Sequence, residues 1–390
     1  MVSDSDVPTQ QRLASIRERL ARDMDRREFL RALTASGYTL GLAQFLGVED
    51  FLSSPDGEVP VVTALVRTDP DDPWSMETRT RSVPAAWYDR VSKAFEYNEL
   101  LAQSTITGYL GSAVVPGSYS DDSASITVEV SVDPAQMREA IERITDGVSI
   151  NFEAIRNLDD LEEDRSVLEP RLARADANPM IPAGYACETE SSMATLGPAL
   201  YDPEGQERYF STAEHAFSEV DTPDGEVVTL PFSNGSRAEI GTVVGSYPVA
   251  DVATIEPLGA YQPSSIIEGK ARYEITGQYT RFGLADLVAR DKPLWKVGAL
   301  TGETSGDIQG IDAVSCVTSS ICRHGQLRWG EETDMTDGDS GSVSFHPDPE
   351  GDDNSVLIAG FNNARTWWPG QSYVWGIAAY HLTEQYGYHF

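Results

Sequence analysis

The chain has 390 residues, which is enough for two or three domains with a sizeable hydrophobic core. It holds 62 acidic against 29 basic residues, a formal net charge of −33 at pH 7. This charge argues against DNA, RNA or anionic lipid as a partner. Acidic excess with very few lysines is typical of proteins adapted to high salt, where counter-ions screen the self-repulsion of the surface. The alternative is an acidic surface that serves solubility alone.

Residues 1–57 contain an export-like segment. The pair Arg26 and Arg27 is followed by Phe29 and Leu30 and then by residues 32–48, a run without charge. The arrangement resembles the twin-arginine export signal, which implies a secreted or cell-surface protein. The run is short and contains several polar residues, so we expect no membrane span. No convincing cleavage site follows. An amphipathic helix in a cytoplasmic protein is the alternative.

Residues 58–157 predict a small α+β domain. Strands are expected over 59–67, 105–116, 124–131 and 148–152 from β-type runs with alternating polarity, and helices over 84–103 and 135–144. Asp133 and Pro134 suit the cap and the first position of the second helix. No motif in this stretch carries chemistry.

Residues 158–182 read as a boundary between domains. An acidic run over 159–164 leads into a polar stretch with scattered arginines, without hydrophobic periodicity. We expect an exposed linker that a protease can cut.

From residue 181 onward the helical signal fades and short strands recur between turns. Examples of these strands are 208–211, 226–230, 239–244, 342–345 and 356–360. Short strands at this spacing predict an all-β sandwich or barrel fold, and two packed barrels fit the length of 183–390.

The stretch 336–342 suits a serine nucleophile. Gly338 and Gly341 flank Ser340, so a substrate backbone can approach closely. In a tight turn the N–H groups of Gly338 and Ser340 would point into one oxyanion pocket. A surface turn without chemistry is the alternative.

A serine nucleophile needs a base, and the chain has five histidines. His215 follows Thr212 and Ala213, and Asp251 begins an Asp-x-Ala segment. Together with Gly-Asp-Ser340-Gly, these segments resemble the chymotrypsin-like serine peptidases, in the family's order and at similar spacing. Residues 294–306 look like the Lys-x-Gly…Thr-Gly-x-Thr-x-Gly hairpin of the bacterial branch. The resemblance covers about residues 183–390.

The resemblance implies two packed antiparallel β-barrels and a serine endopeptidase that uses His215, Asp251 and Ser340 through an acyl-enzyme. It implies a protein or peptide substrate and no cofactor or metal. Bacterial relatives often carry an α+β pro-domain, so residues 58–157 are either a pro-domain or a permanent companion domain.

Further site residues are implied by position alone. Asp334 stands where members that cut after Arg or Lys carry an Asp, and Gly360 and Phe361 resemble the strand that pairs with substrate. Asp339 should form a buried ion pair with a partner that the sequence does not name.

Cys316 and Cys322 enclose residues 317–321 between two β-type runs, which suits a disulfide in an exported protein. Two reduced thiols are the alternative. Cys187 is left over, and no zinc or redox pattern is present.

Two other functions stay open: a protease-fold binding module that no longer cuts, and a serine esterase. The order of His, Asp and Ser disfavours the α/β-hydrolases, whose nucleophile comes first. The sequence does not give the substrate or the oligomeric state.

Overall fold

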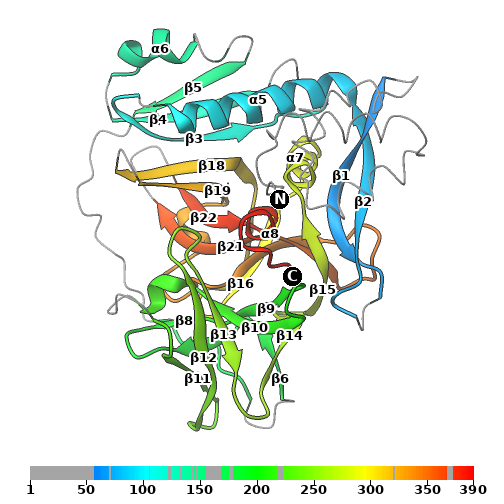
Figure 1. Ribbon diagram of the computed structural model, residues 1–390, viewed down its shortest axis with the longest axis vertical. Helices are drawn as coiled ribbons and strands as arrows, with labels where there is room; N and C mark the ends of the chain where they lie inside the picture. The colour runs from blue at the N-terminus through cyan, green and yellow to red at the C-terminus, as the bar shows by residue number, and fades with distance from the viewer. Residues whose placement is uncertain are drawn as a thin grey trace, which may run out of the picture.

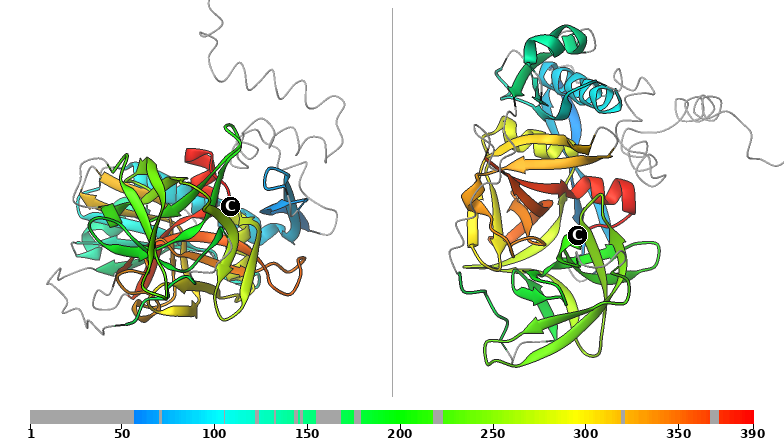
Figure 2. Two further views of the ribbon diagram at one scale, coloured as in Figure 1. Left: turned by 90° about the horizontal axis from the view of Figure 1, so that it is seen from below. Right: turned by 90° about the vertical axis from the view of Figure 1, so that its left-hand side faces the viewer.

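The protein is described by a computed structural model from residue 57 to residue 390. The ranges left out of the description are 1–56, 70–71, 105, 122–123, 132, 143–144, 146–147, 155–167, 175–178, 218–222, 319–320 and 367–371. The twin-arginine-like segment and most of the expected linker lie outside the described residues. The rest is arranged in three tiers, with helices α5 (Ala85–Gln103) and α6 (Pro134–Glu142) at one end and two β units below them (Figure 1, Figure 2).

The tier with α5 and α6 comes from the N-terminal part of the chain. Helix α5 buries Trp87, Val91 and Phe95 along one face, as the apolar spacing predicted. At α6 the side chain of Asp133 accepts a hydrogen bond from the N–H of Ala135 at 3.0 Å, so the predicted cap is present. The elements of this part are β1 (Glu58–Arg67), β2 (Met76–Pro84), α5 (Ala85–Gln103), β3 (Tyr109–Val115), β4 (Ser125–Val130), α6 (Pro134–Glu142) and β5 (Ser149–Ala154).

The first β unit is a curled seven-stranded sheet with the strand order β8-β7-β11-β12-β13-β10-β9. It encloses its own core, which includes Leu196, Phe210, Leu230 and Ile255. The strands are β7 (Ala186–Glu188), β8 (Met193–Thr195), β9 (Gly197–Asp202), β10 (Glu207–Thr212), β11 (Val227–Pro231), β12 (Arg237–Tyr247) and β13 (Val252–Pro257), with the 3-10 turn η1 (Glu214–Phe217) after β10.

The second β unit follows in the chain and occupies the middle tier (Figure 2). Its main path of strands is β17-β16-β20-β21-β22-β19-β18. The elements are β6 (Met180–Ala183), β14 (Gln262–Glu268), β15 (Arg272–Tyr279), α7 (Arg281–Ala289), β16 (Leu294–Gly298), β17 (Gly302–Gly306), β18 (Ile308–Thr318), β19 (Ile321–Trp329), η2 (Glu332–Asp334), β20 (Val343–Pro347), β21 (Ser355–Thr366), β22 (Tyr373–Ala378) and α8 (Ala379–Tyr386). The predicted fold class, all-β barrels with a small α+β part ahead of them, is confirmed.

The N-terminal part and the second β unit share one sheet and one core. Strand β3 pairs antiparallel with β18, so the sheet runs on from the second unit through β3, β4 and β5. Strand β1 pairs with β15 in the same way. A buried ion pair also crosses the junction, from Arg328 on β19 to Glu129 on β4, at 2.6 Å. Residues 58–154 are therefore built into the second unit and do not form a separate lobe.

Two helices in the second unit, α7 and α8, were not predicted from the sequence. Helix α7 is capped by the side chain of Thr280, which accepts from the N–H of Gly283 at 3.1 Å. Almost every side chain of α7 is buried, so its sequence has no polar face to signal a helix. Among the described helices none is both long and apolar enough to cross a membrane.

Candidate active site

His215 and Asp251 meet at one end of the first β unit. His215 lies in η1, directly after β10, and Asp251 lies in the turn between β12 and β13. The His215 Nδ1 atom is 2.9 Å from both carboxylate oxygens of Asp251. A carboxylate only accepts hydrogen bonds, so Nδ1 carries the proton and Nε2 keeps its lone pair.

The Asp251 side chain is held from several directions. The backbone N–H of His215 donates to Asp251 Oδ1 at 2.9 Å, and the residue itself is 2% exposed. Its φ of 57° is in the left-handed region, which Asp adopts more readily than most residues. The turn thus orients the Asp251 carboxylate toward the His215 imidazole and restricts the other orientations of that carboxylate.

The two groups shift each other's protonation. The hydrogen bond to Asp251 raises the pKa of His215 above its usual value, although burial and the charge of Arg323 work in the opposite direction. Burial alone would raise the pKa of Asp251, but the contacts with His215 and Arg323 lower it. Asp251 therefore stays ionised while the imidazole titrates.

Ser340 lies in a tight loop of the second β unit. Gly338 and Gly341 have φ values of 95° and 96°, a region that favours glycine. A Cβ on Gly341 would come within 2.2 Å of the carbonyl oxygen of Thr195. The glycines beside Ser340 are therefore required by the turn. The Ser340 hydroxyl donates to the carbonyl of Asn363 at 3.4 Å, and no hydrogen bond joins it to His215.

Thr195 on β8 holds the carbonyl groups of this loop. Its N–H donates to the Ser340 carbonyl and its hydroxyl to the Gly338 carbonyl, both at 2.8 Å. Among the residues that the structure describes, nothing accepts a hydrogen bond from the N–H of Gly338 or of Ser340. These two unpaired donors are the pair that the sequence proposed for an oxyanion pocket.

The buried partner of Asp339 is Lys296. Its Nζ lies 3.2 Å from Asp339 Oδ2, and neither side chain is exposed. Asp339 also accepts from the N–H groups of Leu300, Thr301 and Thr336. Burial lowers the pKa of Lys296, and the charge of Asp339 opposes that shift. The sequence had named Lys296 within the 294–306 motif without assigning it this contact.

The three residues proposed for substrate binding lie on β21 and in η2. Gly360 and Phe361 sit within β21, hydrogen-bonded between β20 and β22, and Phe361 has no exposure. Both residues are buried, and the part of β21 beside Ser340 is Asn362 and Asn363. The Asp334 carboxylate accepts from the N–H of Glu331 and caps η2.

One charged neighbour of the site was missed by sequence reasoning. Arg323 Nη1 lies 3.4 Å from Asp251 Oδ2. Arg323 follows Cys322, which is joined to Cys316 by a disulfide across the β18–β19 hairpin. Arginine at that position carries no motif, so only the fold could bring it to Asp251. Cys187 is free and fully buried, and burial raises the pKa of its thiol to about 12.

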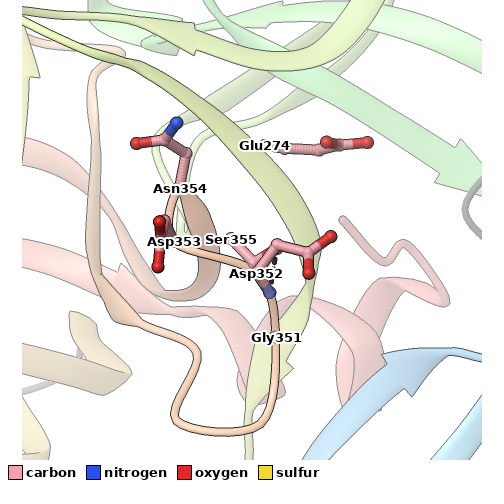
Figure 3. A pocket seen from close by; sticks show the side chains of 6 residues that line it. All are labelled: Glu274, Gly351, Asp352, Asp353, Asn354 and Ser355. Atoms are coloured by element: carbon pink, nitrogen blue, oxygen red, sulfur yellow. Dashed lines mark hydrogen bonds between the residues drawn. The ribbon is translucent and has the colours of Figure 1, made fainter.

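An acidic surface hollow is formed by Glu274 and the loop before β21, residues 351–355 (Figure 3). The carboxylates of Asp352 and Asp353 point in different directions there. Within the described ranges no group of three or more His, Cys, Asp or Glu side chains is arranged to hold a metal ion.

Comparison with known proteins gives matches to solved structures only. No family model and no curated protein matches the chain. Protease A of Thermobifida fusca is 19% identical, and the match covers 54% of this chain and 97% of that one with a TM-score of 0.39. A Cellulomonas bogoriensis chymotrypsin is 15% identical, covering 53% and 96% with a TM-score of 0.37.

A third solved structure, a homologue of alpha-lytic protease called N4, is 14% identical and has a TM-score of 0.38, covering 54% of this chain and 98% of its own. Each of the three matches covers little more than half of this chain. These similarities are distant, with sequence identities below 20% and TM-scores below 0.4.

Proposed function

We propose that the protein is a serine endopeptidase in which Ser340 is the nucleophile, His215 the general base and Asp251 its orienting partner. The observation that carries this proposal is the contact of His215 Nδ1 with both oxygens of the buried Asp251 at 2.9 Å. That contact leaves Nε2 of a neutral imidazole as a proton acceptor, which is what an activated serine requires.

The reaction begins with attack of Ser340 Oγ on a peptide carbonyl carbon while His215 Nε2 takes the hydroxyl proton. The carbonyl oxygen becomes an oxyanion, and the N–H groups of Gly338 and Ser340 stabilise it. His215 then gives its proton to the leaving amine, and the C–N bond breaks to leave an ester on Ser340. Water, deprotonated by His215, hydrolyses that ester and regenerates the enzyme.

The Ser340 hydroxyl must turn from the Asn363 carbonyl toward His215 for this reaction. The hydrogen bond from Ser340 to the Asn363 carbonyl is 3.4 Å long and therefore weak, and Ser340 is 7% exposed. Catalytic hydrogen bonds are often absent or long before substrate binds. A binding module that no longer cuts would keep this unproductive orientation.

The test is reaction of the folded protein with a fluorophosphonate, followed by mapping of the adduct. Labelling at Ser340 that disappears in Ser340→Ala and in His215→Ala supports the proposal. Absence of labelling in a protein shown to be folded refutes the enzyme and favours the binding module. Labelled protein that hydrolyses nitrophenyl esters but cuts no protein would instead support the serine esterase.

Specificity and location belong to the same proposal. A peptide series with Arg, Lys, Phe and Glu before the cleaved bond tests whether Asp334 favours a basic residue. Export by a twin-arginine route predicts that changing Arg26 and Arg27 to Lys retains the protein inside the cell. Because the chain is so acidic, folding and assays should first be tried at high salt.

A further inference from the structure

The three proposed catalytic residues are divided between the two β units. His215 and Asp251 belong to the first unit, whereas Ser340 belongs to the second. Contacts that cross between the units near these residues therefore decide how the base faces the nucleophile. Two such contacts reach the turn that carries Asp251. Asn363 Nδ2 donates to the Ala250 carbonyl at 3.2 Å, and Arg323 Nη1 donates to Asp251 Oδ2 at 3.4 Å.

Arg323 lies near the tip of the β18–β19 hairpin, and other contacts hold this hairpin in place. Its position on β19 is opposite Ser315 on β18, and the neighbouring pair is the disulfide of Cys316 and Cys322. On its other side β18 pairs with β3. The hairpin that carries Arg323 is therefore held covalently near its tip and laterally by the N-terminal part of the chain.

The charges around His215 come from three groups of the described residues. Asp251 and Glu214 are negative and raise its pKa, whereas Arg323 is positive and lowers it. The Asp251 carboxylate faces His215 and Arg323. Arg323 is thus the single positive charge in this set, and Asp251 is almost completely buried between it and the imidazole.

We infer that Arg323 is a positioning residue of the site: its guanidinium holds the Asp251 carboxylate toward His215 across the boundary between the two units. Its positive charge also opposes protonation of the imidazole. Arg323 acts through Asp251 and takes no part in bond making. The inference rests on the proposed function for its effect on rate. Its effect on the titration of His215 does not depend on any activity.

The experiment compares three variants with the wild type. Arg323→Gln removes the charge at similar length, and Arg323→Lys keeps the charge. Arg237→Gln is the matched control, because Arg237 forms an ion pair with Glu188 at 2.7 Å in the first unit and takes no part in the site. The titration of His215 is followed by NMR in protein carrying labelled histidine, with His215→Asn to assign the signal. Fluorophosphonate labelling rates are measured at pH 9, well above the ordinary imidazole pKa of about 6.5, and all samples share one ionic strength.

In Arg323→Gln we expect the His215 midpoint to rise by roughly half a unit, a modest shift because Arg323 is partly exposed and its charge is screened. Labelling at pH 9 should slow about three- to tenfold, since Asp251 loses one of the groups that hold it. Arg323→Lys should recover most of the shift, and Arg237→Gln should match the wild type.

An unmoved midpoint in Arg323→Gln, or an equal shift in Arg237→Gln, overturns the inference. A shifted midpoint with an unchanged labelling rate at pH 9 overturns the positioning role. If the wild type is not labelled at all, the proposed function fails, and the titration still decides whether Arg323 acts on His215.

Discussion

Lys296 Nζ and Asp339 Oδ2 lie 3.2 Å apart, both side chains are completely buried, and Asp339 directly precedes Ser340 in the chain. The Asp339 carboxylate also accepts from the Thr301 hydroxyl and from three backbone N–H groups. A buried charge with this many partners fixes the conformation of the residues next to it. The shape of the proposed oxyanion pocket therefore depends on an ion pair that a substrate never touches.

Replacing Lys296 by Met should destabilise the fold by about 3–5 kcal/mol, because Asp339 would be left as a buried charge without its counter-charge. Denaturant unfolding of the variant measures the loss, and fluorophosphonate labelling of Ser340 should decline with it. Lys270→Met is the control, since Lys270 is largely exposed and 3.9 Å from Glu303. Equal stability of the two variants would contradict the role assigned to Lys296.

Gly341→Ala should destabilise the fold more than Gly235→Ala does. Both glycines have φ near 90°, so both variants carry backbone strain of about 1–3 kcal/mol. At Gly341 the added Cβ also meets the Thr195 carbonyl at 2.2 Å, whereas at Gly235 it meets open space. The difference between the unfolding midpoints of the two variants measures the destabilisation caused by the steric clash with Thr195. A loss no larger at Gly341 than at Gly235 would mean that the loop can move away from Thr195.

The rate of Ser340 labelling should rise with pH with a midpoint above 6.5. Only neutral His215 can accept the serine proton, and its contact with Asp251 raises its pKa above that usual value. As pH falls through the raised pKa the imidazole gains a proton and the base is lost. Labelling rates measured from pH 5 to pH 9 test this. Asp251→Asn should move the midpoint down, and a flat wild-type profile would rule out His215 as the base.

Glu129→Gln should weaken the junction between the N-terminal part and the second β unit. It removes the carboxylate charge 2.6 Å from the buried Arg328 guanidinium, and breaking a buried ion pair in this way typically costs about 3–5 kcal/mol. Denaturant unfolding measures the change. Glu188→Gln, which affects a solvent-exposed pair with Arg237, is the comparison and should have little effect. Similar stability in both variants would indicate that the junction relies on strand pairing alone.

Sequence reasoning succeeded where residue type and local order carry the information. Within residues 58–154 the sequence did not predict β2, but it predicted the other elements to within a few residues, because apolar spacing and the Asp133 cap are local signals. The segments with His215, Asp251 and Ser340 could be named as candidates, and the structure brings His215 and Asp251 into contact.

Contacts between residues far apart in the sequence could not be predicted. Lys296 and Asp339 are 43 residues apart, and no local pattern links them. Gly360 and Phe361 were proposed from their position alone, and nothing local in the sequence shows that β21 is paired on both edges at these residues.

Strand β18 has β19 on one side and β3 on the other. A recombinant fragment that starts at residue 183 would present β18 as a bare edge, with unpaired N–H and C=O groups ready to pair with another molecule. It would also expose the Arg328 side chain that Glu129 now covers. Such a fragment should aggregate at concentrations where the longer chain stays dispersed, so production of this protein should keep residues 58–154.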